Sequence, residues 1–138
     1  MQPILREMHL DDYAAALALW QRCEGIGIGA GDTREGIAQF LARNPGLSLV
    51  AEAPGQIIGT ALSGHDGRRG FIYHLAVDSA HRQTGLGRRL VEACLEQLRA
   101  RGLPKTHIVV YANNHQGQEF WLKLGWMKRD NLLIMSTG

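Results

Sequence analysis

A glycine-containing turn between an apolar strand and an amphipathic helix is the part of the sequence best suited to chemistry. The run from Phe71 to Val77 has strand character, and the segment after the turn carries apolar residues at helical spacing. The turn itself reads R-Q-T-G-L-G at residues 82–87. The first N–H groups of a helix lack intrahelical partners, and the helix dipole favours negative charge there. The stretch therefore predicts an anion site, in which two glycines let the backbone approach a phosphate.

A second glycine-rich stretch, residues 25–32, does not predict a dinucleotide site. A G-x-G-x-x-G fingerprint would need a glycine where Ala30, Asp32 or Arg34 stands, and no strand precedes the stretch. Its glycine content predicts a mobile connection between two helices. A lid that faces a substrate is the alternative, because binding residues often lie on such loops.

Length and composition are those of an ordinary globular chain. The 138 residues are 45% hydrophobic, which is enough to bury a core, and no apolar run is long enough to span a membrane. The N-terminal residues lack the apolar segment of a secretory leader. We therefore expect a single domain over residues 1–138 that has no membrane partner.

Charge and cysteine content narrow the function classes further. The two cysteines, Cys23 and Cys94, match no metal or disulfide spacing, and their apolar surroundings predict buried thiols in the reducing cytoplasm. The formal net charge of +2 is too small by itself to predict nucleic-acid binding. Basic residues nevertheless gather around the glycine turn, namely Arg68, Arg69, Arg82, Arg88 and Arg89.

Apolar periodicity and turn residues predict helices and strands on both sides of the glycine turn. Strands are expected at residues 4–8, 47–52, 56–63 and 71–77, from 106 onward, and at 127–135. Helices are expected from Asp11 or Asp12 to about residue 23, from a cap at Asp32 or Thr33 to about residue 42, and at about 85–101 and 114–124. The helix at 85–101 lies between two strands, which should therefore run parallel. This order predicts an α/β (α+β) fold with a mixed sheet of about seven strands and about four helices.

The turn and a second motif resemble the GNAT (Gcn5-related N-acetyltransferase) superfamily. The family pattern Arg/Gln-x-x-Gly-x-Gly/Ala at a strand–helix junction is matched by Arg82, Gly85 and Gly87. A second family pattern is matched near the C-terminus by Asn114, Gly117, Phe120, Gly125 and Trp126. More narrowly, the chain length and the segments D-G-x-R-G and A-R-G-x-P-K look like those of small bacterial YpeA-like acetyltransferases.

This resemblance implies that acetyl-CoA is the cosubstrate. Backbone N–H groups of residues 83–88 would cradle its pyrophosphate, and the strand edge at Leu75 and Val77 would pair with the pantetheine arm. The Leu75 amide would stabilise the oxyanion that develops on the acetyl carbonyl. The cofactor-binding residues implied in this way are Leu75, Ala76, Val77, Arg82, Gln83, Thr84, Gly85, Leu86, Gly87, Arg88 and Asn114.

Individual side chains near the turn have more specific implied roles. Asn114 would reach the pantetheine or the region of the sulfur. The guanidinium groups of Arg82, Arg88 and Arg89 are candidates for the 3′-phosphate. For these arginines, a solvated helix face is the alternative interpretation.

The resemblance also implies the reaction, which is acetyl transfer to a primary amine of a small molecule or peptide. The family usually protonates the departing thiolate from a tyrosine at the position held here by Trp121, whose indole N–H does not ionise. Glutamates that act as bases in some members align with Phe71 and Val109, which cannot do so. The usual acid and base therefore cannot be assigned. This favours, as an alternative, a non-catalytic acyl-CoA-binding or regulatory domain.

Two tyrosines are the candidate catalytic residues. Tyr73 shares strand parity with Leu75 and could face the acetyl group, whereas His74 should lie on the opposite face as a core or surface histidine. Tyr111 precedes Asn114 by three residues and is expected near the thiol. Tyr73 could act as an acid or as a base through a water molecule, with packing or substrate contact as the alternative, and Tyr111 could likewise supply the missing proton.

The remaining expectations concern partners. Glu24 and Asp32 flank the glycine-rich stretch, and they either recognise a cationic amine or are simply solvated. Family habit implies a homodimer through the last strands. Nucleic acid is not expected as a partner, because few aromatic residues accompany the arginines and one anionic cofactor accounts for their charge.

Overall fold

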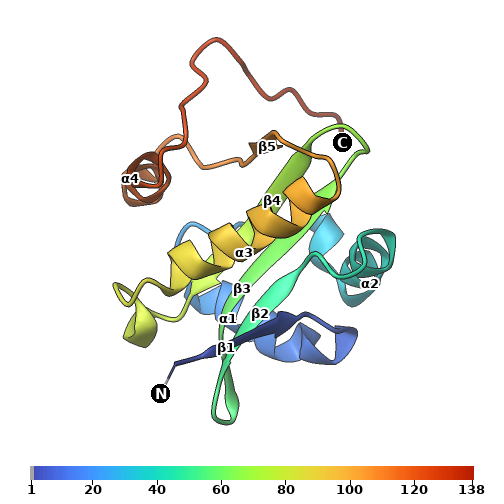
Figure 1. Ribbon diagram of the computed structural model, residues 1–138, viewed down its shortest axis with the longest axis vertical. Coiled ribbons are helices and arrows are strands. Elements are labelled where there is room, and N and C mark those ends of the chain that lie inside the picture. Colours follow the sequence, from blue (N-terminus) through green and yellow to red (C-terminus); the bar gives the residue numbers. More distant parts are fainter. Residues whose placement is uncertain (1) are drawn as a thin grey trace.

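A five-stranded sheet in the order β1-β2-β3-β4-β5 forms the centre of the computed structural model, which describes residues 2–138 (Figure 1). Neighbouring strands are antiparallel from β1 to β4, and β5 runs parallel to β4. The parallel pair is connected by helix α3 (Leu86–Ala100), as the sequence predicts. The strands are β1 (Ile4–Glu7), β2 (Leu49–Ala53), β3 (Gln56–His65), β4 (Gly70–Val77) and β5 (Thr106–His107).

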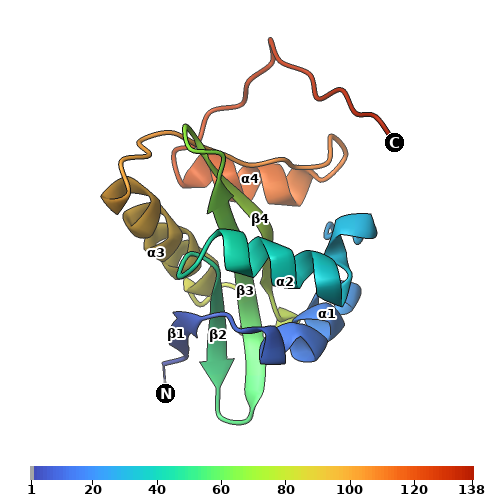
Figure 2. The same cartoon turned by 90° about the vertical axis from the view of Figure 1, so that its right-hand side faces the viewer.

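Helices cover both faces of this sheet. Figure 2 shows α1 and α2 on one face and α3 on the other. Thr33 is the N-cap residue of α2, since its hydroxyl oxygen accepts a hydrogen bond of 3.1 Å from the Gly36 amide. Among residues 2–138, none of the helices is long and apolar enough to cross a lipid bilayer. The bounds of the other helices are α1 (Tyr13–Arg22), α2 (Arg34–Arg43) and α4 (His115–Lys123).

Each face of the sheet has its own buried cluster. On the α1 and α2 face, Trp20 and Ile37 pack with residues of β2, β3 and β4. The opposite face is covered by the apolar stripe of α3, whose spacing predicts it: Leu86, Leu90, Val91 and Cys94. Both cysteines are free and buried, as predicted, and burial raises the pKa of the Cys94 thiol to about 12.

The strand content is lower than the predicted count of about seven, which was wrong. Strand β5 contains two residues, and residues 108–111 continue without a ladder. Residues 127–135 form no strand, although their sequence favours one. Their apolar side chains find no facing surface, and Leu133 and Met135 are 89% and 90% exposed. A strand requires a partner edge as well as propensity, and this segment has none within residues 2–138.

A bulge interrupts the pairing of β4 with β3. Tyr73 pairs with Leu62 and Ala76 pairs with Thr60, so β4 holds one more residue than β3 over this stretch. The backbone of His74, within the bulge, has a φ of 49°, which lies in the left-handed region that side chains rarely adopt. Bulges of this kind redirect side chains and often lie beside functional sites.

The bulge changes which side chains share a face of the sheet. The Tyr73 ring packs against Phe40 of α2, and the His74 ring packs against Trp20 of α1. Two consecutive side chains therefore point to the same face, whereas Leu75 packs with the cluster on the α3 face. The prediction that Tyr73 shares a face with Leu75 was wrong, whereas His74 lies opposite Leu75, as predicted. One extra residue inverts the two-residue alternation of a strand.

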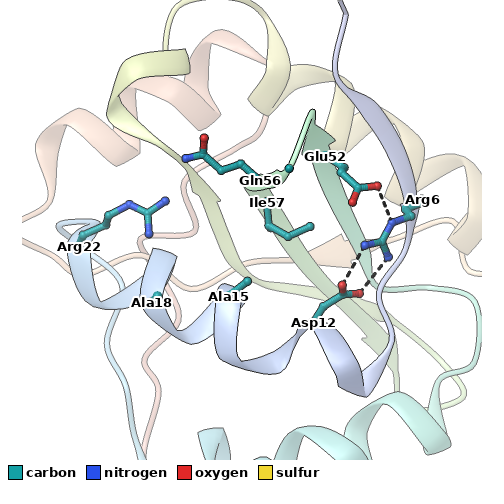
Figure 3. A pocket seen from close by; sticks show the side chains of 9 residues that line it. Arg6, Asp12, Ala15, Ala18, Arg22, Glu52, Gln56 and Ile57 are labelled. Carbon is teal, nitrogen blue, oxygen red and sulfur yellow. Dashed lines mark hydrogen bonds and ion pairs between the residues drawn. The ribbon is translucent and has the colours of Figure 1, made fainter.

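An ion-pair cluster joins β1 to the start of α1. The Arg6 guanidinium donates two hydrogen bonds of 2.9 Å to the Asp12 carboxylate and one of 3.1 Å to Glu52. These residues lie at one end of a shallow depression between α1 and the β2–β3 hairpin (Figure 3). Both acidic side chains that line the depression are therefore already paired with Arg6.

Asp12 should make the stability of the fold depend on pH. The hydrogen bonds from Arg6 hold the pKa of this carboxyl below its ordinary value of 3.8. Its stabilising contribution is therefore complete above pH 3.8 and is lost as the pH falls through the lower pKa of the folded state. At pH 7 we expect Asp12→Asn to reduce the free energy of unfolding by about 1 to 3 kcal/mol.

Urea unfolding of the wild type and Asp12→Asn at several pH values measures this contribution. The difference between the two proteins should shrink as the pH is lowered below 4. A difference that stays constant over the acid range would contradict the role given to the Asp12 charge.

Candidate functional site

The main cleft opens where β4 and the chain after β5 move apart. Their parallel ladder consists of two residue pairs and ends at Phe71 and His107. Beyond that point, residues 72–77 form one wall of the cleft and residues 108–111 form the facing wall. Within residues 2–138, the edge of β4 that faces the cleft has no strand partner. Its backbone N–H and C=O groups are therefore open to an extended ligand.

The predicted cofactor-binding residues gather in this cleft, with Thr84 as the exception. The Thr84 side chain turns back into its own loop, where its hydroxyl donates a hydrogen bond of 2.7 Å to the carbonyl of His81. Tyr73 and Tyr111 also line the cleft. The structure thus brings residues from β4, the glycine turn and the N-terminus of α4 to one place.

The glycine turn has a backbone conformation that suits an anion. Gln83 and Gly85 have φ angles of 62° and 84°, so two left-handed residues precede the first turn of α3. Left-handed residues next to right-handed ones aim successive backbone N–H groups into a concave surface. A Cβ atom at Gly87 would lie 3.1 Å from the Phe120 ring, so a larger residue here would require that ring to shift. The turn therefore fits an anionic group at the N-terminus of α3.

The candidate arginines have different surroundings. Arg82 Nε donates a hydrogen bond of 3.1 Å to the carbonyl of Val77, which holds this side chain at the end of β4. Arg88 forms an exposed ion pair with Glu92, one turn further along α3. Arg89 instead donates to the N-terminal segment, at Gln2 and Pro3, and does not line the cleft. This placement favours Arg82 and Arg88 over Arg89 as phosphate ligands.

The glycine-rich stretch forms part of the cleft wall. A Cβ atom at Gly25 would lie 2.7 Å from Nδ2 of Asn114, and one at Gly27 would collide with the Tyr111 hydroxyl. Asn114 is also the N-cap residue of α4, since its side-chain Oδ1 accepts a hydrogen bond of 2.9 Å from the Gly117 amide. The stretch is thus packed against the site, which favours the lid interpretation over a bare connection.

Trp121 has the surroundings of a packing residue. Its side chain is buried and makes edge-to-face contacts with Phe120 and Trp126, with ring centroids 5.3 and 4.7 Å apart. It lines the cleft at the same time. An indole N–H does not ionise, so the residue shapes the cleft without supplying a proton.

The two candidate tyrosines approach the cleft from opposite walls. Tyr73 lies on β4, and burial, together with the nearby charge of Asp66, raises the pKa of its hydroxyl. Tyr73 is therefore protonated at neutral pH and can donate a proton but not accept one. Tyr111 lies on the facing wall, with its hydroxyl against Gly27.

A histidine–carboxylate pair at the cleft was missed by the sequence interpretation. His74 lines the cleft, and its Nε2 lies 2.9 Å from Oδ1 of Asp32. Asp32 is therefore engaged with His74 instead of being simply solvated. No local sequence pattern predicts this pair, because the contact depends on the bulge in β4 and on how residues 25–32 fold back. Of the two predicted acidic residues, Glu24 lines the cleft directly.

Comparison with known sequences gives a consistent match. The model of the acetyltransferase (GNAT) family matches residues 8–126. An acetyltransferase of Sodalis glossinidius (strain morsitans) is 31% identical over 131 residues, covering 95% of this chain and 92% of that protein. Such relatives favour an enzyme over a non-catalytic binding domain. The narrower YpeA-like resemblance stays a prediction.

Solved structures agree with the fold. Ard1 from Thermoplasma volcanium superposes with a TM-score of 0.79 at 20% identity, covering 92% of this chain and 84% of that one. A protein from Clostridium acetobutylicum that is described as a predicted acetyltransferase, solved with acetyl-CoA, gives a TM-score of 0.76 at 18% identity, covering 97% of this chain and 96% of that one. At these identities the likeness concerns the fold, and it confirms the predicted α/β class.

Proposed function

The chain belongs to the GNAT family of acetyltransferases, and from this we propose that it transfers the acetyl group of acetyl-CoA to a primary amine. The observation that carries the proposal is the separation of β4 from the chain after β5, directly beside the glycine turn. An anion-binding turn and an unpaired strand edge together match the two ends of a CoA molecule, which carries phosphates at one end and an amide-containing arm at the other.

Named residues would hold acetyl-CoA in this cleft. The backbone of residues 83–88 would bind its pyrophosphate, supported by the side chain of Arg82. The edge of β4 from Leu75 to Val77 would accept the pantetheine arm as an added strand. Acetyl-CoA supplies an acetyl group that is activated as a thioester, from which the CoA thiolate is a good leaving group.

The chain contributes positioning and proton transfer. The Leu75 amide would donate a hydrogen bond to the oxygen of the reacting carbonyl, where negative charge develops. The Tyr73 or the Tyr111 hydroxyl would donate a proton to the departing thiolate, in place of the family tyrosine that Trp121 replaces. Holding both substrates in one cleft lowers the barrier further, because it removes the entropy cost of their encounter.

The acceptor is proposed to be a primary amine on a small molecule or peptide. Glu24 lines the cleft and carries a charge that attracts an ammonium group. We also propose that the chain acts in the cytoplasm as a single domain, which its buried free thiols support. A homodimer stays a prediction.

Calorimetry with acetyl-CoA, followed by an assay of CoA release, tests the function. The assay uses a panel that contains a peptide with a free N-terminus, a blocked peptide with one lysine, and a small diamine. We expect saturable binding and amine-dependent release of CoA. Failure of the wild type to bind acetyl-CoA would overturn the proposal.

The tyrosines can be distinguished in the same assay with Tyr73→Phe and Tyr111→Phe. The variant that lacks the proton donor should lose about tenfold or more in kcat, whereas the other should stay near the wild type. Each replacement keeps the aromatic ring and removes only the hydroxyl, so packing is preserved and each variant serves as the control for the other. If both variants retain full kcat, neither hydroxyl is the acid.

A further inference from the structure

His74 and Asp32 form a dyad that two unusual backbone features create. The left-handed conformation of His74 in the β4 bulge directs its side chain toward α1. Residues 25–32 fold back so that Oδ1 of Asp32 lies 2.9 Å from Nε2 of His74. The two side chains are only 16% and 15% exposed. Forty-two positions of sequence separate them, so tertiary structure alone brings them together.

Each member of the dyad is fixed by further contacts. Oδ2 of Asp32 accepts a hydrogen bond of 2.9 Å from the Gly29 amide. The backbone carbonyl of Asp32 accepts one of 2.6 Å from the Tyr13 hydroxyl. The carbonyl of His74 accepts a hydrogen bond of 2.9 Å from the Thr60 hydroxyl. The imidazole packs edge-on against Trp20, with ring centroids 4.7 Å apart. The dyad is therefore rigid, as a catalytic group must be.

The partner of Nε2 decides the form of the imidazole. An ionised carboxylate can only accept, so Nε2 carries the hydrogen and donates it to Asp32. Nδ1 of the neutral ring then holds the lone pair. Within residues 2–138, Nδ1 has no hydrogen-bond partner and is not among the atoms buried without one, so it is open to solvent. His74 lines the cleft, and Nδ1 is the ring nitrogen that Asp32 leaves free to take a proton.

We propose that His74 is the general base of the acetyl transfer and that Asp32 is its positioning residue. The proposal rests on the amine acetyltransferase function proposed above. Nδ1 takes a proton from the ammonium form of the acceptor, so an N–H bond breaks on the amine and forms on the imidazole. The freed electron pair of the amine nitrogen attacks the acetyl carbonyl carbon, the C–N bond forms and the C–S bond breaks. The thiolate leaves with the electron pair of the C–S bond and is protonated by a tyrosine. The acylated nitrogen loses its second proton to the resulting tyrosinate, which gives the neutral amide, and Asp32 stabilises the imidazolium.

The surroundings of the imidazole support this assignment. Asp32 is the ionisable side chain that forms a hydrogen bond or ion pair with the ring among residues 2–138. Helix α1 presents Trp20 to the ring and reaches Asp32 through Tyr13, while β3 presents Thr60. The other ionisable side chains that line the cleft are Cys23, Glu24, Tyr73, His81, Arg82, Arg88 and Tyr111.

The test measures kcat/KM of the wild type, His74→Asn and Asp32→Asn against pH, with the panel amine that gives the fastest CoA release. Asparagine tolerates the left-handed backbone of position 74. For the wild type, we expect kcat/KM to rise with pH over part of the range, and this part of the profile is called the rising limb. His74→Asn should lower kcat by about a hundredfold or more and abolish the limb, while calorimetry shows unchanged binding of acetyl-CoA.

Asp32→Asn keeps His74 and an oxygen for the Gly29 amide but removes the charge. It should lower kcat and move the limb to lower pH, because the imidazolium loses its anionic partner. This variant also decides the matter if circular dichroism shows that His74→Asn does not fold. The control is His65→Asn, since His65 lies outside the cleft and its side-chain Nδ1 accepts a hydrogen bond from the Gly67 amide of the adjoining turn. It should keep the limb of the wild type.

The outcomes separate the dyad from the function on which it rests. An active wild type, with a limb that persists in His74→Asn or does not move in Asp32→Asn, would overturn the dyad alone. A loss of kcat that is equal at every pH would assign His74 a structural role and would likewise overturn it. A wild type that releases no CoA with any amine would overturn the proposed function and the dyad together.

Discussion

A Gly85→Val variant is expected to bind acetyl-CoA about a hundredfold more weakly than the wild type, which corresponds to about 2.7 kcal/mol. Gly85 has a φ of 84° immediately before α3. A left-handed backbone costs a residue with a Cβ roughly 1 to 2 kcal/mol, and a β-branched side chain is the least tolerant. No atom lies within 4 Å of the added Cβ, so the effect comes from conformation and not from a collision. Relaxation of the strain would turn the N–H groups of residues 83–88 away from the pyrophosphate.

Calorimetry with two controls isolates this effect. Gly85→Asn should bind within a few-fold of the wild type, because asparagine tolerates the left-handed region. Gly55→Val introduces the same strain in the β2–β3 turn, where φ is 73° and the added Cβ also meets no atom. It should lower stability without changing the affinity for acetyl-CoA. Equal affinities of Gly85→Val and the wild type would exclude the glycine turn as the phosphate site.

Replacement of Trp121 by alanine is expected to lower the free energy of unfolding by about 3 to 5 kcal/mol. The side chain is 9% exposed and joins α4 to the cluster beneath α3 through Phe120 and Trp126. Its loss would leave a cavity at the edge of the cleft, so the affinity for acetyl-CoA should fall as well. Urea unfolding, followed by circular dichroism, measures the change in stability.

Matched variants separate packing from chemistry at this position. Trp121→Phe keeps an aromatic ring and removes the N–H, and it should keep kcat near the wild-type value if the indole donates no essential hydrogen bond. Leu122→Ala changes an exposed neighbour on the same helix and should alter stability by less than about 0.5 kcal/mol. A large loss of kcat in a stable Trp121→Phe would show that the indole N–H takes part in the reaction.

The elements that were predicted well are those with local signals. The stripe of α3 follows from its 3.6-residue period, and the β2–β3 hairpin follows from Ala53-Pro54-Gly55 between two apolar runs. The errors concern segments whose structure depends on a partner. Residues 108–111 and 127–135 have strand composition, yet a ladder forms only where another edge is available, and propensity carries no information about that edge.

The site divides in the same way. The glycine turn and Asn114 could be placed in one cleft from motifs, because their roles depend on the backbone at helix N-termini. The dyad of His74 and Asp32 could not, since it requires an extra residue in β4 and a loop that returns from a distant part of the chain. A histidine in a left-handed conformation has no signature in a sequence.

The short ladder between β4 and β5 has a thermodynamic consequence. The last quarter of the chain is attached to the sheet by a ladder of only two residue pairs and by the packing of α4 and of residues such as Ile108, Val110 and Trp126. The cleft lies along that seam. A molecule that hydrogen-bonds to the free edge of β4 and contacts the facing wall therefore replaces part of the missing ladder. By mass action, such a ligand at 100 times its Kd raises the stability of the fold by about 2.7 kcal/mol. The cosubstrate would then set the melting temperature of the protein, and its depletion would loosen the C-terminal segment before the rest.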